Sequence, residues 1–231
     1  MLSAIIVAAG ASERMGFDKL FAPLGDRPVI AHTIEAFERT DCIDEIILVG
    51  RSDSLAELRK LLAPDTKVRK VVAGGTERQD SVRIGLAQMD AQADFVAVHD
   101  AARPLITAEK ITRVFELCLI HGAAALAEPV TDTLKRADVD LFVSGSVDRD
   151  QLFAMQTPQI FARELLVEAY AAVAATSTPV TDEVSAVERL GRKVVLVPNH
   201  DFNFKITYPR DFPLAEFVMR ERKNLARRTG A

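Results

Sequence analysis

Two cations, Arg14 and Lys19, lie five positions apart in a loop of small residues that begins at Gly10. The loop follows a short apolar run, residues 4–9, with the composition of a buried strand. Glycine and alanine let backbone N–H groups approach an anion closely, and the cations would neutralise its charge. The spacing matches neither the Walker loop nor the dinucleotide fingerprint. The loop is therefore either a phosphate site or a surface turn with solvated charges.

Polar residues also follow two later segments that are expected to be strands. The run at residues 68–73 leads into "GGTERQDS", and the run at residues 95–99 leads into "DAARP". Because the carboxyl ends of parallel strands meet at one edge of a sheet, these segments are expected to border one crevice with the first loop.

Three polar residues each have more than one interpretation. Asp100 could bind a metal or a ribose, or it could cap a helix or pair with Arg103. His99 is interpreted as structural, because no second histidine or cysteine is spaced to complete a metal site with it. Lys205, in a segment expected to be an apolar strand, "FNFKITYP", either reaches the sheet edge or points into a site.

The composition narrows the class of partner. The chain has 231 residues, of which 48% are hydrophobic and 27% charged, and a net charge of −4. We therefore expect neither a nucleic acid nor a membrane as partner. The first residues lack the basic segment of a secretion signal, and Cys42 and Cys118 form no CxxC pair. These features predict a cytoplasmic protein without disulfides.

Apolar runs alternate with amphipathic stretches through much of the chain. Strands are predicted at residues 4–9, 45–50, 68–73, 95–99, 123–129 and 193–197. Helices are predicted at residues 29–37, 54–62, 79–89, 163–174 and 181–190, and from Pro209 onward. This alternation is typical of an α/β fold with a mostly parallel central sheet and helices on both faces.

Residues 131–150 interrupt this alternation. They predict two short strands, at 133–136 and 141–147, joined by a polar turn. Their apolar content is low for a core hairpin, so we expect a protruding β-arm on a single domain spanning 1–231. The exposed Leu141, Phe142 and Val143 would need a covering surface, and a homodimer would provide it.

Seven motifs, taken in order, resemble one family. They are "VAAGASERMGFDK", "GGTERQDSV", "VHDAARP", "VTDTLKR", "VDRDQLFAMQTPQIF", "TDEVSAVE" and "NFKITYPRD". The set resembles the 2-C-methyl-D-erythritol 4-phosphate cytidylyltransferases and covers nearly the whole chain. The first motif is shared with many nucleotidyltransferases of Rossmann-like fold, but seven in register are specific. The resemblance implies that fold.

The resemblance also implies a reaction. CMP would pass from CTP to 2-C-methyl-D-erythritol 4-phosphate, giving 4-diphosphocytidyl-2-C-methyl-D-erythritol and pyrophosphate in non-mevalonate isoprenoid biosynthesis. By similarity, Arg14 and Lys19 would hold the triphosphate and stabilise the transition state. Arg149 and Lys205 would position the incoming phosphate, with Arg149 reaching the neighbouring subunit's site from the arm.

Substrate contacts and a metal ion follow from the same resemblance. The glycine-rich segment would read the cytosine, Asp100 and Ala101 would meet the ribose or substrate, and threonines would contact the polyol. The residues implied to bind substrate are Ala8, Ala9, Gly10, Gly75, Thr76, Ser81, Asp100, Ala101, Arg103, Thr133, Thr157 and Thr181. Mg²⁺ or another divalent cation would be held mainly by the CTP phosphates, with Asp100 as a further candidate ligand.

Two departures from the family pattern and two rival functions accompany this interpretation. Thr76 stands where familiar members carry an acidic residue, and the spacing from Arg14 to Lys19 is shorter than in some relatives.

One rival is a cytidylyltransferase for another polyol phosphate, such as ribitol 5-phosphate. The other is a nucleotide-binding regulatory protein without turnover. A dehydrogenase is disfavoured because the fingerprint glycines are missing.

Overall fold

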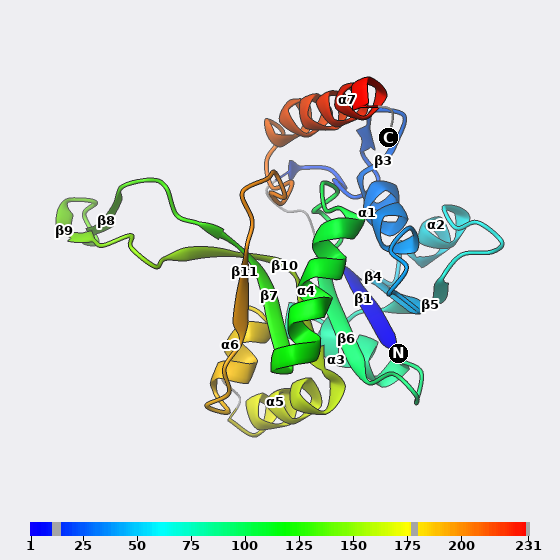
Figure 1. Cartoon of the computed structure of the whole chain (residues 1–231), viewed down its shortest axis with the longest axis horizontal. Helices are drawn as coiled ribbons and strands as arrows, with labels where there is room; N and C mark the ends of the chain where they lie inside the picture. The colour runs from blue at the N-terminus through cyan, green and yellow to red at the C-terminus, as the bar shows by residue number, and fades with distance from the viewer. Residues whose placement is uncertain (11–14, 177–179, 230–231) are drawn as a thin grey trace.

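A twisted sheet forms the centre of the computed structural model, which describes residues 1–10, 15–176 and 180–229 (Figure 1). Across these residues the sheet has seven strands. In spatial order they are β11 (Val195–Pro198), β7 (Ala123–Pro129), β10 (Phe153–Ala162), β6 (Phe95–Asp100), β1 (Leu2–Ala8), β4 (Glu45–Gly50) and β5 (Val68–Ala73). Neighbours pair in parallel except β10, which runs antiparallel to both β6 and β7. The predicted α/β fold with a mostly parallel sheet is confirmed.

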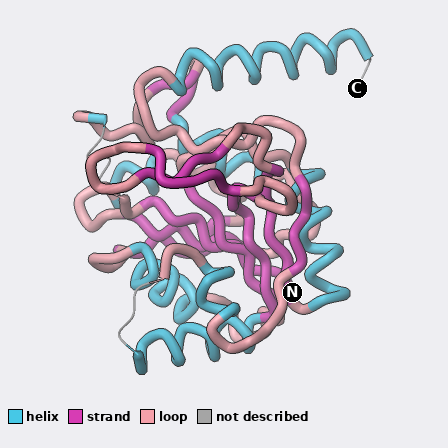
Figure 2. Tube along the Cα trace, turned by 90° about the vertical axis from the view of Figure 1, so that its left-hand side faces the viewer, coloured by secondary structure: helices cyan, strands magenta, loops and turns pink. Residues whose placement is uncertain are grey.

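Helices cover both faces of this sheet. The helices are α1 (Val29–Glu38), α2 (Leu55–Lys60), α3 (Arg78–Gln88), α4 (Ala108–His121), α5 (Arg163–Thr176), α6 (Glu183–Glu188) and α7 (Asp211–Thr229). Buried residues of α1, α2 and α4 belong to one apolar cluster, and those of α3, α5 and α6 belong to another. The helices therefore form two layers with the sheet between them (Figures 1 and 2).

Alternation within β1 separates the two clusters. Ile6 joins the cluster that contains Phe37 of α1, whereas its neighbour Ile5 joins the cluster that contains Val82 of α3. Successive side chains of a strand point to opposite faces, so a continuous apolar run is what a strand covered on both faces requires. This explains why the apolar runs predicted the parallel strands correctly.

Helix α7 lies outside these layers and projects past the body of the molecule (Figure 2). Its residues Ala215 and Val218 pack in a small cluster with Leu24 and Val29. Leu24 belongs to the short hairpin of β2 (Pro23–Leu24) and β3 (Arg27–Pro28). Across the described residues, no helix is both long and apolar enough to cross a membrane.

Two details of the sequence interpretation are wrong. The segment around Lys205 is not a strand, because its backbone joins no ladder. The last helix begins at Asp211 rather than Pro209. The Asp211 carboxylate accepts the N–H groups of Thr207 at 2.7 Å and Tyr208 at 2.8 Å, which folds the preceding residues into a turn. Pro209 lies in that turn.

The arm leaves the body between β7 and β10 (Figure 1). It consists of β8 (Leu134–Ala137) and β9 (Val143–Val147), which pair antiparallel in a separate two-stranded sheet. Its tip carries Leu141 and Phe142, which are 84% and 72% exposed. The predicted protruding β-arm is present; its first strand is shifted by one residue from the predicted range, and its second is two residues shorter than expected. That it mediates dimerisation remains a prediction.

Candidate active site

A cavity of about 520 Å³ opens at the carboxyl ends of β1 and β6 and beside the loop that follows β5. β1 lies between β6 and β4, and β4 pairs with β5, so these strands end at the same edge. That edge is where ligands bind in open α/β sheets. Of the residues implied by the resemblance, those that line the cavity are Ala8, Ala9, Gly10, Lys19, Gly75, Thr76, Ser81, Asp100 and Lys205.

The glycine-rich wall of the cavity is shaped by close packing. A Cβ on Gly74 would lie 2.7 Å from the Cβ of Ala9, and a Cβ on Gly75 would overlap Asp80. The Gly75 N–H donates to the Ser81 hydroxyl at 3.2 Å, which holds the loop against the first turn of α3. The two glycines are therefore needed for the loop to approach β1 and α3 this closely.

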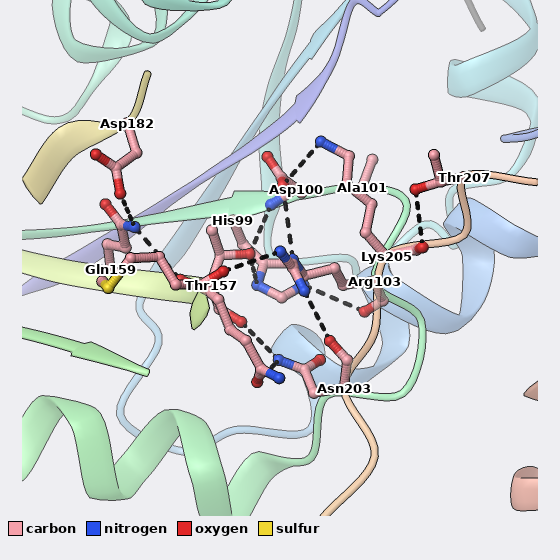
Figure 3. A network of polar contacts seen from close by, with 12 residues as sticks. His99, Asp100, Ala101, Arg103, Thr157, Gln159, Asp182, Asn203, Lys205 and Thr207 are labelled. Atoms are coloured by element: carbon pink, nitrogen blue, oxygen red, sulfur yellow. Dashed lines mark hydrogen bonds and ion pairs between the residues drawn. The ribbon is translucent and has the colours of Figure 1, made fainter. Parts of the chain in front are cut away.

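Asp100 is the electrostatic centre of the site (Figure 3). Its carboxylate lies 3.0 Å from Lys205 Nζ, 3.2 Å from Arg78 Nε and 3.6 Å from Arg103 Nε. Burial alone would raise the pKa of Asp100, but Arg78, Lys205 and Arg103 together lower it well below its usual range. Asp100 thus stays ionised and directs the ammonium group of Lys205 into the cavity. Of the alternatives for Asp100, the pairing with Arg103 is present, whereas binding of a metal or a ribose by this cavity-lining carboxylate remains a prediction.

Arg78 forms an ion pair that the sequence interpretation missed. Its guanidinium donates to both carboxylate oxygens of Glu183, at 2.6 and 3.0 Å, and the Tyr170 hydroxyl donates to the same carboxylate at 2.9 Å. Burial opposes the charge of Arg78, but Glu183 and Asp100 raise its pKa overall. Arg78 itself lines the cavity, and the pair links this wall of the cavity, at the start of α3, to α6. Both residues lie in quoted motifs, but their separation of 105 positions conceals the contact.

His99 helps to hold the backbone of Asp100 in place through Thr157 (Figure 3). Its Nε2 lies 3.3 Å from the Arg103 carbonyl oxygen, which only accepts, so this nitrogen carries the proton. Nδ1 then accepts the Thr157 hydroxyl at 3.0 Å, and Thr157 Oγ1 accepts the Asp100 N–H at 3.1 Å. Burial lowers the pKa of His99 to about 3, so the ring is neutral. The structural role predicted for His99 fits these contacts.

The other implied site residues that the structure describes do not line this cavity. Ala101, Arg103 and Thr157 lie beneath it, where they are buried or nearly so. Thr133 and Thr181 are exposed, and Arg149 is exposed and donates to the Thr131 carbonyl oxygen near the base of the arm. Arg14 lies outside the described residues. The roles of all these residues remain predictions.

The described residues do not supply a cage for a metal ion. Among them, no group of three or more His, Cys, Asp or Glu side chains is placed to hold one. Asp100, the candidate ligand, is already surrounded by three cationic side chains. A divalent cation would therefore be held mainly by other groups, and those of a nucleotide triphosphate suit it.

The fold and this cavity define a nucleotidyltransferase. A sequence model described as 2-C-methyl-D-erythritol 4-phosphate cytidylyltransferase matches residues 2–221. The chain belongs to that family.

Curated relatives and solved structures agree with this assignment. The cytidylyltransferase of Symbiobacterium thermophilum is 40% identical over 95% of this chain and 93% of its own length. That of Prochlorococcus marinus is 41% identical over 95% and 99%. The 4-diphosphocytidyl-2C-methyl-D-erythritol synthase of Anaerococcus prevotii superposes with a TM-score of 0.85 at 33% identity, covering 95% of this chain and 96% of that one.

These findings confirm the predicted family, its Rossmann-like nucleotidyltransferase fold and its class of activity. The chain is a cytidylyltransferase, and its family acts in non-mevalonate isoprenoid biosynthesis. The regulatory protein without turnover is therefore rejected. The relatives named above carry the methylerythritol name, and they give no support to the ribitol phosphate alternative.

Proposed function

We propose that the cavity beside β1, β5 and β6 is where this chain carries out the reaction of its family. The phosphate of 2-C-methyl-D-erythritol 4-phosphate attacks the α-phosphorus of CTP through one of its oxygens. The bond between that phosphorus and the oxygen bridging to the β-phosphate breaks, and pyrophosphate leaves with the bonding electron pair. The product is 4-diphosphocytidyl-2-C-methyl-D-erythritol.

The observation that carries this proposal is the convergence of Lys19 and Lys205 on one cavity. A phosphate monoester and a triphosphate repel each other, so the reaction needs cations that face both. Lys205, aligned by Asp100 at 3.0 Å, would position the attacking phosphate. Lys19 would hold the triphosphate with Arg14. The monoester is largely ionised near neutral pH, so the reaction requires no general base.

Other assignments extend the proposal. The loop at Gly75 and Thr76, with Ser81 and the end of β1, would contact the cytosine. Thr76 lines the cavity but is not acidic like its counterpart in familiar members, so base recognition there would rest largely on backbone groups and Ser81. Mg²⁺ or another divalent cation would enter with the CTP phosphates. The chain would act as a homodimer, in which Arg149 of one copy serves the cavity of the other. A cytoplasmic location stays a prediction.

Pyrophosphate release tests the proposed function. The chain is incubated with CTP, UTP or ATP together with either 2-C-methyl-D-erythritol 4-phosphate or ribitol 5-phosphate, with Mg²⁺ or with a chelator. We expect fastest release with CTP and the methylerythritol phosphate, and loss of release with the chelator. Faster turnover with ribitol 5-phosphate would show that this compound is the substrate instead. If no combination of nucleotide and polyol phosphate releases pyrophosphate, the proposal is refuted.

A further inference from the structure

A carboxylate stands beside the cation that we assign to the triphosphate. Asp18 directly precedes Lys19, which lines the cavity. A negative charge at this position would repel CTP, since like charges at close range disfavour binding. Its presence in the loop therefore needs a physical reason.

The structure turns this carboxylate toward the sheet. Asp18 Oδ2 lies 2.7 Å from a guanidinium nitrogen of Arg51, the residue that directly follows β4. Asp18 Oδ1 accepts the N–H of Leu20 at 3.1 Å, and the Asp18 carbonyl accepts the N–H of Ala22 at 3.1 Å. Asp18 therefore fixes the loop on both sides of Lys19. Its side chain holds the loop to Arg51 at the end of β4, and its contacts with Leu20 and Ala22 hold it to the following turn.

Arg51 also has a second carboxylate partner. Its Nε lies 3.1 Å from Asp53, whose side chain is 74% exposed. The side chains of Asp18 and Arg51 are themselves only 24% and 28% exposed, so their charges are less screened than those of a fully exposed pair. Burial would lower the pKa of Arg51, but the hydrogen bond and the charge of Asp18 raise it overall.

We propose that Asp18 and Arg51 are positioning residues for CTP binding. The pair fixes the loop that presents Lys19, and Arg51 neutralises the carboxylate that would otherwise repel the triphosphate. This inference rests on the proposed function only in taking the cavity as the CTP site. If the pair served only the stability of the fold, its loss would lower the melting temperature and leave CTP affinity unchanged. A partly exposed ion pair contributes little to stability.

The two roles of Arg51 predict an unusual order of CTP affinities. Arg51→Gln loses the tether and leaves the Asp18 charge uncompensated, so its Kd and KM for CTP should rise about fivefold. Asp18→Asn keeps an oxygen for the Leu20 N–H and removes the charge, so it should have a smaller effect. The double variant should bind CTP better than Arg51→Gln alone, because the repulsive carboxylate is gone.

Two control variants change Asp53, the second carboxylate partner of Arg51, and replace Arg51 by another cation. Asp53→Asn removes the other carboxylate of Arg51 without touching the loop, and it should leave CTP affinity unchanged. Arg51→Lys should recover part of the loss. The KM for 2-C-methyl-D-erythritol 4-phosphate and the melting temperature should change little in every variant, because the pair serves the nucleotide.

Calorimetric binding of CTP and turnover are measured side by side on the full chain. Unchanged CTP affinity in Arg51→Gln, or a double variant weaker than Arg51→Gln, would overturn the inference. If the wild type binds CTP but releases no pyrophosphate, the proposed function fails while the affinity order still decides on the pair. Absence of CTP binding by the wild type would overturn both.

Discussion

Asp100 organises the site because one buried carboxylate serves three cations. Arg78, Arg103 and Lys205 all approach it, and Arg78 is further paired with Glu183. Ionised side chains buried this deeply are tolerated when they are paired and hydrogen-bonded. Because the cations outnumber the carboxylates, the cluster keeps an excess of positive charge beside the cavity, which favours an anionic substrate.

His99 predicts how stability depends on pH. Its folded pKa of about 3 lies below the ordinary value of 6.5, so the unfolded chain takes up a proton first as the pH falls. Stability is therefore unaffected by His99 above pH 6.5 and decreases below it, by up to about 1.4 kcal/mol per pH unit. Urea unfolding between about pH 6.5 and 5 measures this slope, before most carboxylates titrate.

A pair of histidine variants isolates this contribution. His99→Gln should be less stable than the wild type at every pH, because the buried hydrogen bonds of the ring are lost, but its stability should change less steeply with pH. The pKa of His32 is also lowered by burial, so part of the slope should remain. His121 is exposed, and His121→Gln should keep the wild-type slope. A wild-type slope in His99→Gln would contradict the neutral buried ring.

At the scale of elements, the Arg78–Glu183 pair joins α3 to α6 on one face of the sheet. Glu183 is fully buried, and Arg78 is held between it and Asp100. Glu183→Gln leaves Arg78 without its bidentate partner and should lower the free energy of unfolding by about 3 kcal/mol. Chemical denaturation followed by circular dichroism measures the change.

The matched control for this prediction lies on the same helix. Arg83 pairs with Asp80 at 3.7 Å, and its side chain is 54% exposed. Arg83→Gln removes a cation from α3 without disturbing a buried charge, so it should cost less than about 1 kcal/mol. Equal losses in the two variants would mean that the buried pair contributes no more than a surface pair.

The elements also show what the sequence could reveal. The strands β1, β4, β6 and β7 were predictable because a strand covered on both faces is a nearly unbroken apolar run. The edge strand β5 has two exposed cations, and its three valines made it predictable. The antiparallel β10 was not predicted, because polar residues interrupt it at Gln156, Thr157 and Gln159. These side chains are buried but satisfied, as when Gln156 donates to Glu128 at 2.9 Å and Gln159 to Asp182 at 2.9 Å.

The candidate site was predictable where its residues follow strands. Asp100 ends the predicted strand β6 and the glycine-rich segment follows the predicted strand β5, so their meeting in one cavity follows from the topology of a parallel sheet. Lys205 was assigned to a strand although it lies in an irregular segment, and its direction depends on Asp100, 105 positions away. Arg51 and Asp18 gave no signal, because a pairing between two loops depends on how the strands are ordered in the sheet.

At the scale of the whole molecule, the arm carries apolar surface that the single chain leaves exposed. Val139, Leu141, Phe142 and Val143 are between 68% and 95% exposed. Surface of this kind marks an interaction site, and a second copy is the partner that symmetry favours. Arg149 lies beside the arm and not in the cavity, which fits the proposal that it serves the neighbouring copy.

Mixing two inactive variants tests this exchange directly. Lys19→Ala should disable the cavity of its own copy, whereas Arg149→Ala should disable the cavity of its partner, so each homodimer should have little activity. When the two variants are unfolded, mixed in equal amounts and refolded, half of the dimers combine one of each. Each mixed dimer then has one intact site, so activity should recover to about a quarter of the wild-type value.

The control adds Leu141→Asp to both variants, which should prevent dimerisation and abolish the recovery. If Lys19→Ala and Arg149→Ala form mixed dimers but recover no activity, Arg149 acts in the site of its own copy.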